Sequence, residues 1–294
     1  MEVLLDAYHT RAGPWGTAYF PAAARAGGER LAAEIQAGLE RVEERLGRAR
    51  GRPLTAVLTP DRLEFARIYR ALLGRRPERW VAGAAFPAWD LLLVRGDSLS
   101  YLKPPRERPR AVLEHELAHL VIHRRPETAV PRWFDEGLAM WASGQLLWPE
   151  DEAFLSGLAR IGALHSLEAL EREVPASHDL AAIAYQESLL LVEWIVLRFG
   201  PGAVGHLLDA LERGEDFPRA FEARTGLSLR ELEARFRLWL RGKRGLWEVI
   251  FQSVDLWTIA SVLALLAIAR GALRRRRRLR EMEEAERGDP APPT

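Results

Sequence analysis

The sequence of 294 residues contains no cysteine, which excludes disulfide bonds and thiolate ligands for a metal. A metal ion bound by this chain must therefore be held by histidine and carboxylate side chains. Lysine is nearly absent as well: Lys103 and Lys243 are the two lysines, and arginine supplies almost all of the positive charge. The 42 basic residues against 41 acidic ones leave a net charge of +1, which gives no indication of a nucleic-acid partner.

The hydrophobic patterns predict strands in the first third of the chain and helices in the rest. Strands are expected at residues 2–9, 54–59, 80–86 and 90–96, with helices at 21–47 and 60–73 between them. The proline-rich segment 101–110 is expected to be irregular. Helices are then expected at 111–123, 132–146, 150–161, 181–199, 201–213, 217–224 and 228–242. This order predicts an α+β fold in which a small N-terminal β-sheet with helices precedes a mostly helical half.

Near the C-terminus, residues 249–269 form an apolar run long enough to span a membrane, and the basic run RRRRRLR (274–280) follows it. A surface amphipathic helix is the alternative, but residues 256–268 are apolar on every face apart from Thr258 and Ser261. We therefore predict three parts, namely a folded domain over 1–245, one transmembrane helix over 246–273 and a basic, then disordered tail over 274–294.

Two features of the sequence give conflicting indications of the membrane topology. The basic run places the C-terminal tail in the cytoplasm, and a single span then puts the folded domain outside. The first residues, MEVLLDAYHT, show no signal peptide. Either a signal is missing from this chain, or the span inserts with its N-terminal domain outward, or the domain faces the cytoplasm. We expect a single-pass membrane protein with an extracytoplasmic domain.

The stretch HELAHLVIH (115–123) carries two histidines four residues apart, with a glutamate between them. On a helix His115 and His119 project from one face, one turn apart, and two neutral imidazoles at that separation can bind one zinc ion. Glu116 lies beside that face, where it can take a proton from a water that the metal activates. The apolar residues around the motif predict a buried helix and a dry site.

The third protein ligand has two candidates, His123 and Glu136. On a continuous helix His123 lies about 12 Å along the axis from His115, too far for three nitrogens to converge on one ion. No glycine breaks the helix before it, so His123 is expected to support the site or simply to pack beside it. Pro131 starts a second helix, and a short linker brings Glu136 back beside the first one. Two histidines, one glutamate and an open fourth position are typical of catalytic zinc.

HELAH followed by WFDEGLAMW (133–141) resembles the gluzincins, the thermolysin-like clan of zinc metallopeptidases, and more closely the small peptidase MA-like domain family of that clan. The family pattern is an HE-L-x-H helix and then a W-[FL]-x-E-G-[LI]-A helix, and the resemblance extends over most of residues 1–242. It implies a zinc metallopeptidase that hydrolyses a peptide or protein substrate, with Zn²⁺ held by His115, His119 and Glu136; together with the predicted span this gives a membrane-anchored enzyme.

The resemblance also implies roles for neighbouring residues. Glu116 is the expected general base and then acid, and Tyr185 matches a position whose hydroxyl steadies the oxyanion, although a tyrosine packed on the core explains it equally well. The strand near 83–86 is expected to pair with an extended substrate. Met140 stands where thermolysin has an aspartate that orients a histidine ligand, and Asp135 is the candidate replacement. The sequence shows no acidic signature for holding a free amino terminus, which does not favour an aminopeptidase.

Two other classes of function compete with a peptidase. One is a non-catalytic module on the same scaffold that binds a peptide or protein at the membrane, and the other is a purely structural membrane protein. The intact metal and base residues favour the enzyme, because a module without chemistry has no need of Glu116 between the histidines. Five tryptophans are expected in the core rather than in a binding surface: Trp80, Trp89, Trp133, Trp141 and Trp194.

Overall fold

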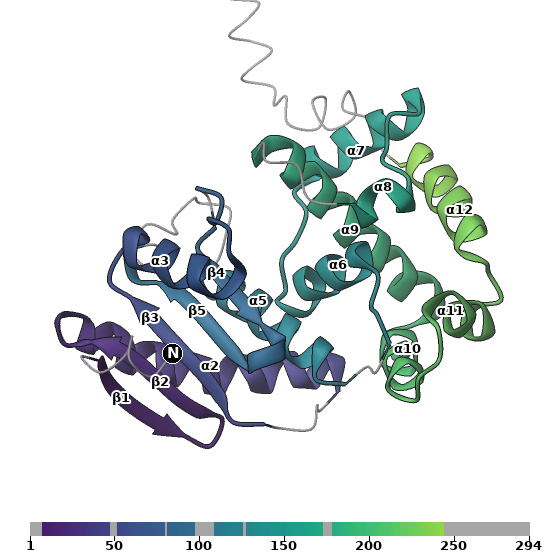
Figure 1. The fold of residues 1–294 in the computed structure, drawn as a ribbon. Helices are drawn as coiled ribbons and strands as arrows, with labels where there is room; N and C mark the ends of the chain where they lie inside the picture. The colour runs from purple at the N-terminus through teal and green to yellow at the C-terminus, as the bar shows by residue number, and fades with distance from the viewer. Residues whose placement is uncertain are drawn as a thin grey trace, which may run out of the picture. The chain divides into compact units, whose positions relative to one another are not determined.

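A five-stranded mixed sheet is followed by a series of helices in the computed structural model, which describes residues 8–47, 52–79, 81–97, 109–125, 128–172 and 178–243 (Figure 1). The sheet half contains β1 (Tyr8–Gly13), β2 (Gly16–Pro21), η1 (Ala22–Ala24), α2 (Arg25–Leu46), β3 (Leu54–Thr59), α3 (Arg62–Leu73), β4 (Gly83–Phe86), η2 (Pro87–Trp89) and β5 (Leu91–Arg95). The helical half contains α5 (Pro109–His123), α6 (Arg132–Ala142), α7 (Pro149–Ile161), α8 (Leu167–Glu171), α9 (His178–Phe199), α10 (Gly202–Glu212), α11 (Phe217–Thr225) and α12 (Leu229–Arg241). This is the predicted combination of a small N-terminal sheet with a mostly helical remainder.

The sheet has the strand order β1-β2-β3-β5-β4. Strands β2, β3 and β5 are parallel, whereas β1 and β4 run antiparallel to their neighbours at the two edges. In β4, Gly83 pairs with Val94 and Phe86 pairs with Leu91, and no described strand pairs with its other side. The position of β4 at an edge leaves one row of backbone groups free for other partners.

Alternating side chains divide the packing between the two faces of the sheet. Leu92 and Val94 join the main core with α2 and α5, whereas Leu91 and Leu93 join a smaller cluster around Phe65 of α3. This is the pattern expected of a sheet covered on both faces, in which successive residues point to opposite sides. The main core continues without interruption from the sheet through α5 into the helical half.

Helix α5 is buried on most of its surface, and α2 crosses it closely. Side chains on several faces of α5, among them Leu113, Leu117 and Val121, are buried. A Cβ atom on Gly38 of α2 would lie 2.8 Å from the side chain of Leu117, so this glycine permits the close contact. A tertiary framework of this kind fixes the orientation of α5, and with it the face that carries the HELAH motif.

Several of the boundary predictions were wrong. The predicted helix at 21–47 begins at Arg25, because residues 16–21 form β2, a strand that the prediction missed. Helix α5 begins at Pro109, within the segment 101–110 that was expected to be irregular, because proline suits the first turn of a helix. Helix α6 ends at Ala142 rather than at 146, which leaves a non-helical segment, 143–148, before α7. The short helix α8 was not predicted.

One described helix has the length and composition of a membrane span: Leu180–Phe199 within α9. Half of this helix is buried inside the structure, where α9 packs against α6, α7 and α10. Its apolar composition therefore follows from its place in the core. The predicted transmembrane helix at 246–273 lies outside the described residues.

Candidate metal centre

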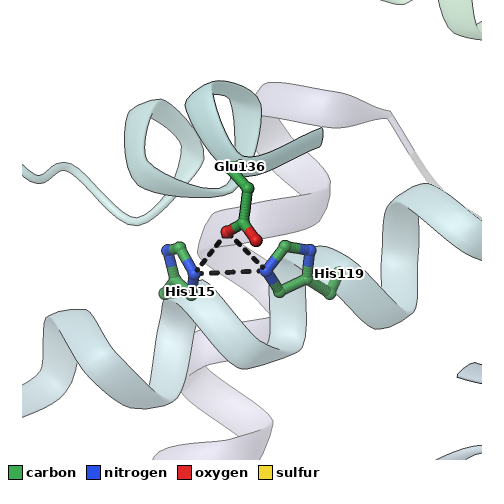
Figure 2. A group of neighbouring side chains, drawn as sticks. All are labelled: His115, His119 and Glu136. Carbon is green, nitrogen blue, oxygen red and sulfur yellow. Dashed lines mark hydrogen bonds and ion pairs between the residues drawn. The ribbon is translucent and has the colours of Figure 1, made fainter. Parts of the chain in front are cut away.

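Helices α5 and α6 bring His115, His119 and Glu136 together (Figure 2). The two histidines project side by side from α5, and Glu136 extends toward them from the first turns of α6. Pro131 precedes α6 with an extended backbone, and its carbonyl accepts hydrogen bonds from the amides of Phe134 and Asp135. The start of α6 is thus fixed at the residue that the sequence indicated, and Glu136 faces the motif as predicted.

The distances between these side chains fit a zinc ion. The Nε2 atoms of His115 and His119 lie 3.1 Å apart, and each lies 3.5 Å from Oε2 of Glu136. Ligand atoms about 2.0–2.1 Å from a tetrahedral zinc ion lie roughly 3.3 Å from one another. The three donors therefore form the face of a tetrahedron of the right size, and two histidines with one carboxylate are a ligand set that zinc accepts.

The pKa shifts in the cluster are also consistent with a site for a cation. Burial alone would raise the pKa of Glu136, but the neighbouring histidines outweigh burial and lower that pKa to about 2. Burial would likewise lower the pKa of His119, but Asp135 and Glu136 raise it well above its ordinary value. These directions show that two carboxylates converge on His119 and that a positive charge is favoured at this place. A bound divalent cation supplies that charge and leaves the imidazoles neutral.

Asp135 holds two histidines at once. Its Oδ1 lies 3.0 Å from Nδ1 of His119, and its Oδ2 lies 2.9 Å from Nε2 of His123. A carboxylate can only accept, so Nδ1 of His119 carries a hydrogen, and in the neutral ring that a metal requires Nε2 carries the lone pair. The structure thus places His123 behind the cluster rather than in it. His119, His123 and Asp135 also form a second group close enough to hold a cation.

Glu116 lies against the edge strand. The backbone N–H of Ala85 in β4 donates a hydrogen bond to Oε2 of Glu116, with a distance of 2.7 Å. A Cβ atom on Gly83 would lie 3.0 Å from Cγ of Glu116, so the absence of a side chain at that position makes room for the glutamate. Strand β4 therefore positions the carboxylate of Glu116 beside the candidate metal ligands, and Glu116 is not part of that group.

Tyr185 of α9 reaches the same site. Burial raises the pKa of Tyr185 far above its ordinary value of 10, and the carboxylates of Glu136 and Glu116 raise it further. This direction favours the protonated hydroxyl, which can donate a hydrogen bond. Arg132, which the sequence analysis did not single out, opposes this shift, and its guanidinium lies 3.8 Å from Oε1 of Glu136. The one signal that could have found Arg132 is its position one helical turn before Glu136.

The cluster opens into a groove with a volume of about 1220 Å³. Its walls include β4, α5, the start of α6, the segment 143–148 and part of α9, so His115, Glu116, His119, Glu136 and Tyr185 all line one space. The groove also corrects one prediction: Trp89 is 50% exposed and lines the groove, whereas Trp133 and Trp194 are buried in the core as expected.

Comparison with protein families identifies the class to which this site belongs. A family model described as the Peptidase MA superfamily matches residues 37–242, which includes both helices of the cluster. The chain belongs to this superfamily. The resemblance to peptidase MA-like domains seen in the sequence is therefore confirmed, and the fold is that of a zinc peptidase-like domain.

Solved structures are similar over a large part of the chain at low sequence identity. A variant of the M1 zinc metallopeptidase from Deinococcus radiodurans is 19% identical, with a TM-score of 0.49, and the match covers 81% of this chain and 53% of that one. Yeast LTA4 hydrolase is 12% identical, with a TM-score of 0.43, and the match covers 75% of this chain and 38% of that one. The matches thus cover about half of the metallopeptidase chain and less than half of the LTA4 hydrolase chain. No curated protein sequence matches.

Proposed function

We propose that this chain is a zinc metallopeptidase that hydrolyses peptide bonds by attack of water, with His115, His119 and Glu136 as the metal ligands. The convergence of these three donors beside Glu116, in a groove bordered by an edge strand, carries the proposal. The distances among the donors and the membership in the Peptidase MA superfamily support it. Two histidines and one glutamate leave a fourth position for substrate or water, which is the arrangement of catalytic rather than structural zinc.

In this mechanism Glu116 transfers a proton, and Tyr185 stabilises the negative charge that develops on the carbonyl oxygen. The chemistry that bound zinc supplies is polarisation of the scissile carbonyl and a lowered pKa of the attacking water. Glu116 takes the proton of that water as it attacks, and then delivers the proton to the nitrogen of the leaving amine. Tyr185 donates its hydroxyl hydrogen toward the carbonyl oxygen as negative charge develops there. No covalent intermediate with the enzyme is required.

Two substitutions test the assignment. Glu116→Gln retains the shape of the site and the three ligands, so we expect one zinc per chain by mass spectrometry and a loss of turnover of about 10² to 10⁴. His119→Ala removes a ligand, so we expect loss of both zinc and turnover. Full activity of Glu116→Gln would show that another group is the base. A zinc-loaded wild-type chain that hydrolyses no peptide would favour the non-catalytic binding module instead.

We also propose that residues 246–273 anchor this domain to a membrane, with the domain extracytoplasmic and the basic tail cytoplasmic. The support is the apolar run 249–269 and the arginine-rich run after it. Reporter fusions at both termini test the orientation. Activity of an extracytoplasmic reporter at the N-terminus is the expected result, and a cytoplasmic N-terminus would contradict it.

A further inference from the structure

The groove extends well beyond the metal cluster, and large apolar side chains line both of its walls. One wall belongs to the sheet half and the other to the segment that follows α6. The apolar residues concerned are Tyr69, Leu73, Phe86 and Trp89 on the first wall, and Leu146 and Trp148 on the second. On the first wall the rings form a connected group, with Phe86 centred 5.7 Å from Tyr69 and 6.0 Å from Trp89.

Several of these apolar side chains are exposed to solvent. Leu146 is 75% exposed and Trp89 is 50% exposed, although both lie in a groove rather than on a convex surface. Exposed apolar residues that are gathered on one concave surface mark a binding site, whereas scattered ones need no explanation. The groove away from the metal centre is largely uncharged. Among the described lining residues outside the metal centre and its immediate neighbours, Asp151 is the one charged residue.

The edge strand defines the form of the ligand. The N–H of Ala85 points to Glu116 and therefore away from β5, so the free row of backbone groups on β4 faces the site. Four strand residues at about 3.3 Å each extend over roughly 13 Å. The N–H of Ala85 is already bonded to Glu116, so an extended peptide can pair with the remaining outward groups of this row, whereas a single amino acid is much shorter than the row.

We propose that Trp89 and Leu146, on the two walls of the groove, select an internal, extended segment of a polypeptide by packing against its bulky apolar side chains, while its backbone pairs with β4 as the family resemblance already implies. On this basis the enzyme is an endopeptidase that selects apolar side chains near the scissile bond. This selectivity deepens the proposed function and, as far as cleavage is concerned, rests on it. The binding itself does not depend on catalysis, and it can be measured separately.

The test uses the full-length Glu116→Gln chain loaded with zinc and two fluorescent peptides blocked at both ends, one with a central leucine and one with a central serine. We expect the leucine peptide to bind about tenfold more tightly than the serine peptide, as judged by fluorescence anisotropy. In the same background Leu146→Ala is expected to abolish most of this preference. Leu197→Ala is the matched control, because Leu197 is 73% exposed and is absent from the groove lining.

A second pair of variants guards against misfolding. Trp89→Ala is expected to reduce the preference for leucine, and Phe154→Ala, at 47% exposure and outside the groove lining, is expected to leave it unchanged. Comparing two peptides with each variant separates a specific contact from a general loss of structure, since misfolding weakens both peptides alike. Equal binding of the two peptides, or equal effects of the groove variants and their controls, would overturn the inference.

Hydrolysis by the wild-type chain then distinguishes this inference from the proposed function. If the Glu116→Gln chain shows the preference that depends on Leu146 but the wild-type chain cleaves neither peptide, the groove assignment stands and the catalytic proposal fails. If the wild-type chain cleaves peptides only when their amino terminus is free, or without preference for leucine over serine, the peptidase stands and the endopeptidase inference is wrong.

Discussion

At the scale of single residues, Asp135 is the side chain that links the candidate metal centre to His123. Its two oxygens accept from His119 and His123, so its charge is shared between a ligand and a residue outside the ligand set. The hydrogen bond to His119 fixes the tautomer and the ring orientation that the metal requires, and it makes the imidazole a stronger donor. Met140 occupies the position where the family resemblance implies an orienting aspartate, and the carboxylate that contacts His119 is that of Asp135.

This assignment predicts the effect of Asp135→Asn. An amide can offer one oxygen to one histidine, but its NH₂ group cannot accept from the other, so the grip on His119 weakens. We expect zinc affinity to fall by about 10–100-fold, as measured by competition with a chelator. Asp151→Asn is the control, because Asp151 lines the same groove without belonging to either metal-binding group. Equal zinc affinity in the two variants would show that Asp135 has no orienting role.

At the scale of the elements, the position of α6 depends on its contact with α9. A Cβ atom on Gly137 would lie 2.2 Å from the carbonyl oxygen of Ser188, so the two helices are packed with no room for a methyl group. Gly137 directly follows Glu136 in the chain. The closeness of α6 to α9 therefore sets both the packing of the core and the depth at which Glu136 meets the histidines, and Tyr185 enters the site from the same part of α9.

Gly137→Ala is accordingly expected to reduce stability and zinc affinity together. The added methyl group must push α6 away from α9, which costs about 3 kcal/mol in the free energy of unfolding. Gly157→Ala in α7 is the matched control: no atom lies within 4 Å of its Cβ position, and alanine is favoured over glycine in a helix by about 0.5–1 kcal/mol. Urea denaturation measures both. A stable Gly137→Ala variant with normal zinc affinity would contradict the argument.

The elements also show which features the sequence made predictable. The spacing of His115 and His119 and the helix start at Pro131 are local signals, so the ligand cluster could be predicted before the structure. The strand predicted at 2–9 overlaps β1 at Tyr8 and His9, and residues 2–7 lie outside the described residues. The rest of the hairpin was missed because the residues of β1 are mostly exposed and show no alternation of apolar and polar side chains. The groove wall at Leu146 could not be predicted, since an exposed leucine acquires meaning only from the tertiary structure around it.

At the scale of the whole molecule, the metal centre joins elements that are distant in sequence. Helix α5 presents the histidines, α6 the glutamate and β4 the contact to Glu116, so the candidate metal centre lies where the sheet half meets the helical half. Without a cation, the carboxylates of Asp135 and Glu136 and the histidines must neutralise one another in a largely buried space. Binding of the ion to the folded chain alone therefore stabilises the fold.

Removal of the metal should lower the melting temperature. At a free zinc concentration about 100 times Kd, binding contributes about 2.7 kcal/mol, which corresponds to a shift of roughly 5–10 °C for a domain of this size. We expect a chelator to produce this decrease in the wild-type chain and to have no effect on His119→Ala, as measured by calorimetry. An equal response of the two chains would place the stabilising ion elsewhere.

The proposed membrane attachment is assigned to the apolar run 249–269 rather than to the described domain. Helix α9 is apolar enough to span a membrane, but it packs in the core against α6, so the proposal does not assign the anchor to it. We expect the full chain to remain in membranes washed with alkaline carbonate, and residues 1–243 to be recovered in the soluble fraction.

A pair of arginine substitutions separates the two apolar helices. Ile259→Arg places a charge within the predicted span, at a cost of about 2.5–3.5 kcal/mol for insertion, so a larger fraction of the chain should be released by carbonate. Leu197→Arg alters α9 at a side chain that is already 73% exposed, and membrane retention should stay unchanged. Release of the unmodified chain by carbonate would favour a surface helix. Release of Leu197→Arg but not of Ile259→Arg would show that α9 is the anchor, which its place in the core argues against.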